Sequence, residues 1–238
     1  MSSLPAYTLR VSARARQVRI EVSARHGLVV VVPKGFARSR IPAVLQARQD
    51  WIERALGRLG QSAAVIAPPL ELPRQIALRA IGEDWVVRTK DAEGPWVRAS
   101  EAGAGLLLVS GHISHIPACL QVLRFWLQRK SHQRLVPWLR QTSLDEGLPF
   151  ERTLVKRQRT RWASCSGRHT ISINQNLLFL PRRLVRYVFI HELCHTIHLN
   201  HSREFWAVLR DKEPAYETLR AELRKASQWV PAWIDPAG

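Results

Sequence analysis

Cysteine is scarce in this 238-residue chain, and the three that occur, Cys119, Cys165 and Cys194, form no Cys-x-x-Cys pair. Such an odd set does not build the disulfide scaffold on which many small secreted domains depend. Residues 1–6 also lack the basic start and apolar stretch of a secretory signal. We therefore expect a cytoplasmic protein in a reducing compartment.

Long hydrophobic runs are absent as well. No stretch of about 18 apolar residues occurs, so we expect no transmembrane helix and no membrane partner. The chain is nevertheless 46% hydrophobic, which is enough to bury a sizeable core as one large domain or two small ones. We find no internal repeat and no low-complexity segment.

Acidic residues are few beside the basic ones: 19 Asp and Glu face 36 Lys and Arg, for a net charge of +17, and only six of the basic residues are Lys. Such a charge attracts polyanions, and Arg grips phosphate bidentately, so non-specific nucleic acid is one expected partner. The alternative is a solvated basic surface without a role, which the even scatter of Arg along the chain favours. One dense cluster stands out, formed by Arg152, Lys156, Arg157, Arg159 and Arg161.

The most informative segment that is present is His191-Glu192-Leu193-Cys194-His195. On a helix, residues four apart lie on one face, so both histidines can turn a ring nitrogen toward one ion. Glu192 can then reach water bound to that ion. Zinc held by three protein groups keeps a position for water and lowers its pKa from about 15.7 to roughly 7. The segment therefore predicts a zinc-dependent hydrolase with Glu192 as its base.

The third ligand has several candidates. His198 lies about 10 Å along the helix from His191 at 1.5 Å per residue, too far for two Zn–N bonds of about 2.1 Å. His201 is better placed, because Asn200 can end the helix in a left-handed turn and Ser202 can cap the next one. Carboxylates of the following helix stay open as alternatives: Glu204, Glu213 and Glu217.

The two cysteines near the motif admit a simpler interpretation than metal binding. Cys194 points about 100° around the helix from the adjacent His195, so we expect it to pack as a small hydrophobic side chain. Cys165 can approach the zinc, but a buried thiol is the preferred interpretation.

These residues resemble the YgjP-like metallopeptidase family, together with Arg161-Trp162-Ala163-Ser164-Cys165-Ser166, Tyr187-Val188, Asn200-His201-Ser202 and Phe205-Trp206. The resemblance extends to Pro33-Lys34-Gly35 and Trp51-Ile52, and so covers most of the chain. It implies a zincin-type peptidase domain with His191, His195 and His201 as zinc ligands and Glu192 as catalytic base. At the site and its two helices only, the chain is also similar to SprT/Wss1-like proteases, which digest proteins crosslinked to DNA.

Periodicity predicts an α+β fold with a β-rich N-terminal half before the zincin-like catalytic half. The expected boundary lies near Gly111 to Pro117, giving domains 1–112 and 113–238. The expected strands span 18–22, 28–32, 75–81, 84–89, 96–99, 106–110, 152–158 and 169–174, the first two joined as a hairpin through 24–27. The expected helices span 41–59, 116–146 with a kink at Pro137, the motif helix starting at Pro181, one after His201, and 216–226; residues 67–69 break the chain.

The sequence thus favours a zinc metallopeptidase acting on a peptide or protein. In zincins the substrate pairs with an edge strand beside the metal, and residues 170–174 are the candidate strand, with an internal strand as the alternative. A competing hypothesis is an Arg-rich nucleic-acid-binding protein with a structural zinc, which would need no Glu192. A protease recruited to DNA combines both ideas.

Overall fold

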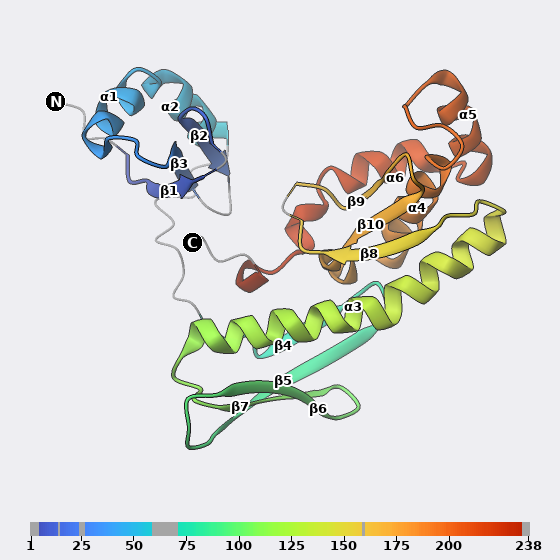
Figure 1. Ribbon diagram of the computed structural model, residues 1–238, viewed down its shortest axis with the longest axis horizontal. Coiled ribbons are helices and arrows are strands. Elements are labelled where there is room, and N and C mark those ends of the chain that lie inside the picture. The colour runs from blue at the N-terminus through green and yellow to red at the C-terminus, as the bar shows by residue number, and fades with distance from the viewer. Residues whose placement is uncertain (1–4, 14, 24–26, 59–70, 159, 235–238) are drawn as a thin grey trace. The chain divides into compact units, whose positions relative to one another are not determined.

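The computed structural model describes residues 5–13, 15–23, 27–58, 71–158 and 160–234 (Figure 1). The chain divides into two compact units between Glu71 and Leu72. This division differs from the expected boundary at residues 112 and 113. The expected break at residues 67–69 lies outside the described residues.

The N-terminal unit packs a three-stranded sheet against two short helices. Its strand order is β1-β3-β2, with β1 parallel and β2 antiparallel to β3. The expected antiparallel partners, β2 and β3, are therefore paired, although residues 24–26 of the turn lie outside the described part. The sequence predicted one helix over residues 41–59, but the structure has two. A tight turn separates them at Arg48, whose backbone N–H donates to the Leu45 backbone oxygen at 3.1 Å. The elements are β1 (Thr8–Ser12), β2 (Arg19–Ser23), β3 (Gly27–Pro33), α1 (Ile41–Gln46) and α2 (Gln49–Arg58).

The core of this unit is small and aliphatic. Alternate residues of β3 turn inward against one face of the helices, as the period of two of a strand requires. Its fully buried members are Leu28, Val30, Val32, Ile41, Leu45 and Ile52.

The second unit begins with a four-stranded sheet of order β4-β5-β7-β6, covered by the long helix α3. Trp126 of the helix packs edge-on against Trp85 of β5 at 5.3 Å and donates a 2.9 Å hydrogen bond to Glu101 of β6. Because this sheet and helix share one core, the chain does not divide between them. The elements are β4 (Gln75–Leu78), β5 (Glu83–Asp91), β6 (Val97–Gly103), β7 (Leu106–Gly111) and α3 (Ile116–Glu146).

Helix α3 has clear ends. The His115 side chain accepts from Ala118 N–H at its start, and Gly147 closes it in the left-handed conformation (φ 66°). Pro137 lies inside the helix, which continues on both sides of it.

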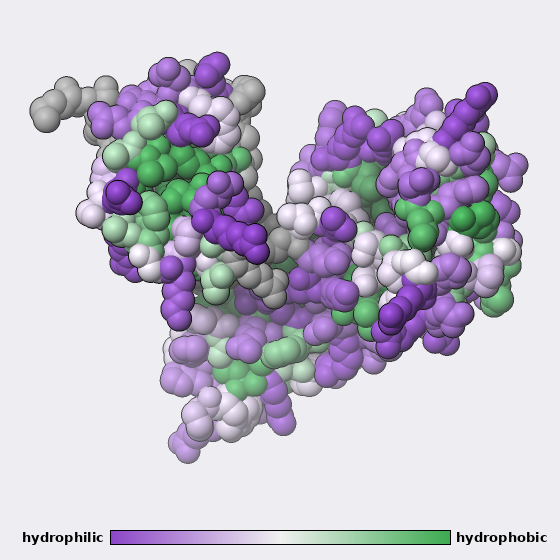
Figure 2. Space-filling model, turned by 45° about the horizontal axis from the view of Figure 1, so that its top comes forward, coloured by the Kyte–Doolittle hydropathy of each residue, from purple (hydrophilic) through white to green (hydrophobic). Residues whose placement is uncertain are grey.

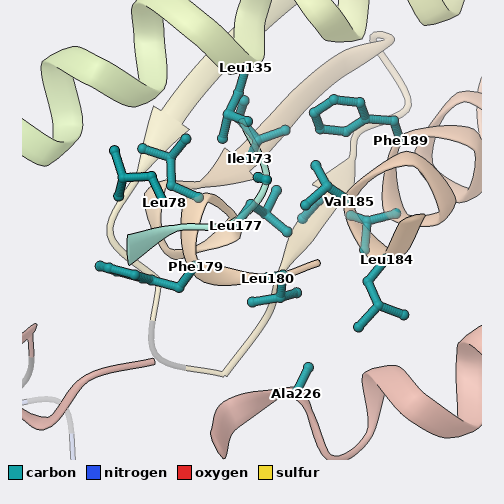
Figure 3. Close-up of a cluster of buried hydrophobic side chains, with 14 of the residues drawn as sticks. Leu78, Leu135, Ile173, Leu177, Phe179, Leu180, Leu184, Val185, Phe189 and Ala226 are labelled. Atoms are coloured by element: carbon teal, nitrogen blue, oxygen red, sulfur yellow. The ribbon is translucent and has the colours of Figure 1, made fainter. Parts of the chain in front are cut away.

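The rest of the second unit places a second sheet beside a group of helices. The strand order is β8-β10-β9, with β8 parallel and β9 antiparallel to β10. Figure 3 shows Leu135 of α3, Ile173 of β10, Phe179 and Val185 of α4 pointing into the same buried cluster. The elements are β8 (Arg152–Lys156), β9 (Ala163–Cys165), β10 (Thr170–Asn174), the 3-10 helix η2 (Gln175–Phe179), α4 (Arg182–Cys194), α5 (Arg203–Lys212), α6 (Tyr216–Leu223) and the 3-10 helices η3 (Ala226–Trp229) and η4 (Ala232–Ile234).

The surface of this unit is mainly hydrophilic on the face shown in Figure 2. No helix within the described ranges combines the length and the apolar character needed to cross a membrane.

Candidate functional site

Helix α4 is buried along most of its length. Leu184, Val185, Phe189 and Ile190 are fully enclosed, which holds the end of the helix in the core of the second unit. Pro181 is its N-cap, one position earlier than the first helical residue. The polar residues His191, Glu192 and His195 follow directly on this apolar run, so they lie at the inner end of the helix.

Three histidines converge there. One ring nitrogen from each of His191, His195 and His201 lies within 4.8 Å of the other two, and Nε2 of His191 lies 3.1 Å from Nε2 of His201. Nitrogens bound to one tetrahedral zinc lie about 3.4 Å apart, given bonds of about 2.1 Å. The spacing therefore fits a single metal ion.

The turn that delivers His201 differs in part from the expected one. The left-handed turn predicted at Asn200 is wrong: α4 ends earlier, at Cys194, and His169 is the only non-glycine residue with a positive φ in the described part of the chain. Successive backbone bonds, Thr196 N–H to Leu193 O and Ile197 N–H to Cys194 O, carry the chain out of the helix instead. The predicted cap is confirmed, since Ser202 Oγ accepts from Phe205 N–H at 3.4 Å at the start of α5.

Two aromatic side chains of α5 hold the imidazoles in place. Phe205 stacks on His195 with ring centroids 4.5 Å apart, and Trp206 stacks on His201 at 5.4 Å. Trp206 also donates its indole N–H to the backbone oxygen of His201 at 3.1 Å. We did not expect this role for Trp206; its place four residues after the Ser202 cap is the signal that could have indicated it.

The tautomer of His195 follows from a backbone contact. Its Nδ1 lies 2.9 Å from the carbonyl oxygen of His198, an acceptor only, so Nδ1 carries the proton and Nε2 keeps its lone pair. His198 thus takes part through its backbone, and its ring is not in the cluster. Nδ1 of His191 is buried and has no hydrogen-bond partner among the described residues.

The alternative carboxylate ligands are engaged elsewhere. Glu204 is exposed and bonds with Ser202 and its own backbone N–H, which lowers its pKa. Glu213 forms a 2.7 Å ion pair with Arg186, and Glu217 accepts from the Tyr216 hydroxyl at 2.8 Å. None of the three joins the histidine cluster.

The environment keeps two of the three imidazoles, those of His191 and His201, neutral. Burial, and then the charges of His195 and His201, lower the pKa of His191 to about 3. Burial, and then the charge of His195, also lower the pKa of His201. Neutral imidazoles offer the lone pairs that a metal needs, so the donor set fits zinc in chemistry as well as in spacing.

Glu192 lies beside the cluster and is 7% exposed. Burial is the largest effect on its pKa and raises it to about 7. Two weaker effects lower the pKa: a hydrogen bond from the backbone N–H of Cys165 and the charge of Arg161. A carboxyl group with this pKa is partly ionised at neutral pH and suits proton transfer in both directions. The part played by the Cys165 backbone could not be foreseen from residue types.

The strand nearest to Glu192 is β9, not the expected residues 170–174. β10 lies between β8 and β9, so of the two interpretations of residues 170–174 the internal strand is confirmed and the edge strand is not. Bonds from Ser166 N–H to Thr170 O and from Asn174 N–H to Trp162 O join β9 to β10. In an antiparallel pair, every second residue turns its backbone N–H and C=O groups away from the partner strand. In β9 these residues are Ala163 and Cys165, and the Cys165 N–H donates to Glu192.

The cysteines are packed thiols. Cys194 is fully buried, and burial raises its pKa to about 11. Burial, and then the charge of Glu192, raise the pKa of Cys165 to about 11 as well. Both thiols stay protonated near neutral pH, and neither belongs to the metal-binding group.

The motif, the cluster and the buried glutamate agree with a comparison of the sequence with known families. The YgjP-like metallopeptidase domain matches residues 16–226. The chain belongs to the YgjP-like metallopeptidase family. The resemblance seen in the motifs is thereby confirmed, and the family identifies the protein as a peptidase with a metal ion.

Other comparisons add little to this assignment. No curated protein matches the chain significantly. The crystal structure of the metallopeptidase zymogen of Methanocaldococcus jannaschii jannalysin is similar at 18% sequence identity and a TM-score of 0.33, over 37% of this chain and 90% of that one.

Proposed function

We propose that this YgjP-like protein is a zinc-dependent peptidase in which His191, His195 and His201 hold the ion and Glu192 is the general base. The observation that carries the proposal is the convergence of three imidazole nitrogens beside one buried carboxyl group. When bound, zinc would supply a Lewis acid that polarises the scissile carbonyl and makes water acidic enough to attack near neutral pH.

Glu192 performs the proton transfers. Its ionised form takes a proton from the attacking water, and the resulting acid gives that proton to the leaving amine. Both steps require the two forms to be close in energy, which a pKa of about 7 provides. The Cys165 N–H and the Arg161 charge stabilise the ionised form and so keep a fraction of Glu192 ready as a base.

The substrate backbone pairs with β9 in this proposal. The Cys165 N–H is taken by Glu192, but the outward N–H and C=O groups of Ala163 and the C=O group of Cys165 form an open edge within the described part of the second sheet. An extended peptide can add to such an edge as a further strand. That placement brings its carbonyls toward Glu192, because Cys165 contacts Glu192 directly.

The competing function, nucleic-acid binding with a structural zinc, is less well supported. Structural zinc sites typically use four protein ligands, whereas three are gathered here in the described residues. A structural site also has no use for a buried glutamate with a raised pKa next to its ligands. A peptidase that additionally associates with DNA through its Arg residues stays compatible with this site.

The test is the Glu192→Gln variant. It should keep its zinc and fold but lose at least about a hundredfold of its casein cleavage, since general-base catalysis typically contributes roughly 10²–10⁴. Glu204→Gln is the matched control, because it makes the same change at an exposed carboxylate on α5. Equal cleavage by the Glu192→Gln variant and the parent protein would remove Glu192 from the mechanism.

A further inference from the structure

Beside the histidine cluster lies a second feature that the proposed chemistry does not use. A cavity of about 820 Å³ opens between α5 and α6, and four arginines line it: Arg203, Arg210, Arg220 and Arg224. Trp206 and Tyr216 form the aromatic part of the wall.

The positive charge of this cavity is largely uncompensated. The guanidinium groups of Arg203 and Arg224 form neither an ion pair nor a hydrogen bond in the described part of the chain, and that of Arg210 donates only to the Tyr216 hydroxyl at 3.3 Å. The one carboxylate in the lining, Glu217, already accepts from that hydroxyl. Nearby arginines outside the cavity are instead paired with carboxylates, as Arg186 is with Glu146 and Glu213.

One side chain joins this cavity to the metal-binding cluster. Trp206 lines the cavity and stacks on His201, with ring planes 27° apart. The Arg220 guanidinium lies over the same indole, 4.7 Å from its centroid. Arg220 of the cavity and His201 of the cluster therefore contact the same indole ring.

We propose that this cavity binds an acidic side chain of the peptide substrate, next to the bond that is cleaved. The inference rests on the proposed peptidase function and names its substrate class. Guanidinium groups present paired N–H donors that match a carboxylate bidentately, and arginine stays charged at any working pH. Four arginines around one carboxylate should give a strong preference for Asp or Glu in the substrate.

The aromatic lining favours a carboxylate over a nucleic acid. A single-stranded nucleic acid needs open ring faces on which its bases can stack. The Trp206 ring is already in contact with His201, Arg220 and Tyr216. The cavity thus offers charge without a free stacking platform.

The experiment compares two families of quenched fluorogenic peptides that are identical except for Glu or Gln at the positions flanking the scissile bond. Charged hydrogen bonds contribute roughly 1.5–3 kcal/mol, so Glu peptides should have at least about a tenfold higher kcat/KM, mostly through KM. In Arg203→Gln/Arg224→Gln this preference should fall to about one, with metal content unchanged. Arg88→Gln/Arg140→Gln, which changes the same charge at two exposed arginines outside the cavity, should keep it.

Binding of the same peptides, measured by fluorescence anisotropy, separates the two proposals. Preferential binding of the Glu peptides that depends on Arg203 and Arg224, without any cleavage, supports the cavity assignment and counts against the peptidase function. Cleavage with equal binding and turnover of Glu and Gln peptides leaves the peptidase intact and overturns this inference. Oligothymidylate binding that is lost in Arg203→Gln/Arg224→Gln, with no preference among the peptides, also overturns it and assigns the cavity to nucleic acid.

Discussion

Burial sets the protonation state of each polar side chain at this site. The pKa of His191 falls to about 3 and that of Glu192 rises to about 7, since burial disfavours the charged form of both. The two shifts have opposite signs on the pH scale but the same physical origin. They leave a neutral imidazole next to a carboxyl group that can exchange protons near neutral pH.

The lowered pKa of His191 predicts unusual pH dependence of zinc binding. Three ordinary imidazoles would each compete with a proton below about pH 6.5, so affinity would fall by up to about three decades per pH unit. His191 should add no proton competition until the pH approaches 3, and the pKa of His201 is lowered too. We expect the slope of log Kd against pH to be well below three between pH 6.5 and 5, measured by competition with a fluorescent chelator. A slope near three would show that the rings are solvated.

Metal analysis of single variants tests the ligand set. We expect about one zinc per parent chain and much less in His191→Ala, His195→Ala and His201→Ala, because each removes one of three converging nitrogens. His198→Ala is the matched control, since His198 acts through its backbone oxygen, and it should keep full occupancy. Full occupancy in His201→Ala combined with loss in Glu204→Ala or Glu213→Ala would overturn the assignment.

At the scale of elements, the position of the short strand β9 depends on one buried side chain. Asn174, 3% exposed, donates to the carbonyls of Gln158 and Arg161 at 2.7 and 2.9 Å and accepts from Asn176 N–H. It thereby ties the end of β10 to the segment that leads into β9. Since Cys165 of β9 contacts Glu192, the Asn174 side chain affects Glu192 indirectly, by holding β9 in position.

Asn174→Asp should therefore harm both stability and activity. The carboxylate keeps the acceptor but loses both donors and faces two carbonyl oxygens, so we expect a loss of about 2–4 kcal/mol in the free energy of unfolding. Urea denaturation measures the stability, and casein cleavage below the unfolding transition measures the activity. Asn200→Asp makes the same change at an exposed residue and should be nearly neutral. Equal effects of the two variants would remove Asn174 from this role.

Local patterns predicted elements better than their arrangement. Helix α3 has its predicted ends because a histidine cap, a first-turn proline and a closing glycine mark them in the sequence. Strand β9 has only three residues, which are too few for alternation to reveal it. Strand order is decided by packing between distant segments, so the alternation of 170–174 correctly indicated a strand but not its central place.

The candidate site shows the same difference between what local pattern predicts and what tertiary structure decides. The convergence of His191, His195 and His201 could be predicted from spacing, since the three share one short stretch of chain. The Cys165 backbone and the arginines of α6 reach the site only through tertiary structure, and no residue pattern signals them.

At the scale of the whole molecule, two separate cores explain where the chain divides. The aliphatic core around β3 shares no member with the large core, which runs from β4 through α3 to η4. The β4–β7 sheet covers Leu120, Leu123 and Trp126 of α3 and therefore belongs with the histidine cluster.

Two fragments test this division. A fragment of residues 72–238 should melt cooperatively and bind zinc, because it keeps the whole large core. A fragment of residues 113–238 should not, because each large apolar side chain of α3 left exposed loses roughly 1.5–3 kcal/mol against a net stability of about 5–15. Thermal denaturation by circular dichroism and metal content decide the matter. A cooperative melt of the shorter fragment would place the division where the sequence first suggested it.

The net charge of +17 predicts a further property of the intact chain. We expect weak, sequence-indifferent binding to DNA or RNA that falls steeply between about 50 and 200 mM salt, as counterion release requires. Electrophoretic mobility shifts at several salt concentrations measure it. Salt-independent binding, or a preferred sequence, would contradict a purely electrostatic origin.

The end of α4, the turn after it and the start of α5 contain all three converging ring nitrogens, the Ser202 cap and both stacking rings. The backbone N–H that lowers the pKa of Glu192 comes from β9 instead. Closing a short loop loses little chain entropy, but joining β9 to α4 must await the sheet. We therefore expect the stacking of Phe205 on His195 and of Trp206 on His201 to form early in folding, before Cys165 reaches Glu192. A folding intermediate would then hold the three imidazoles near one another while its carboxyl group still lacks the contact that lowers its pKa.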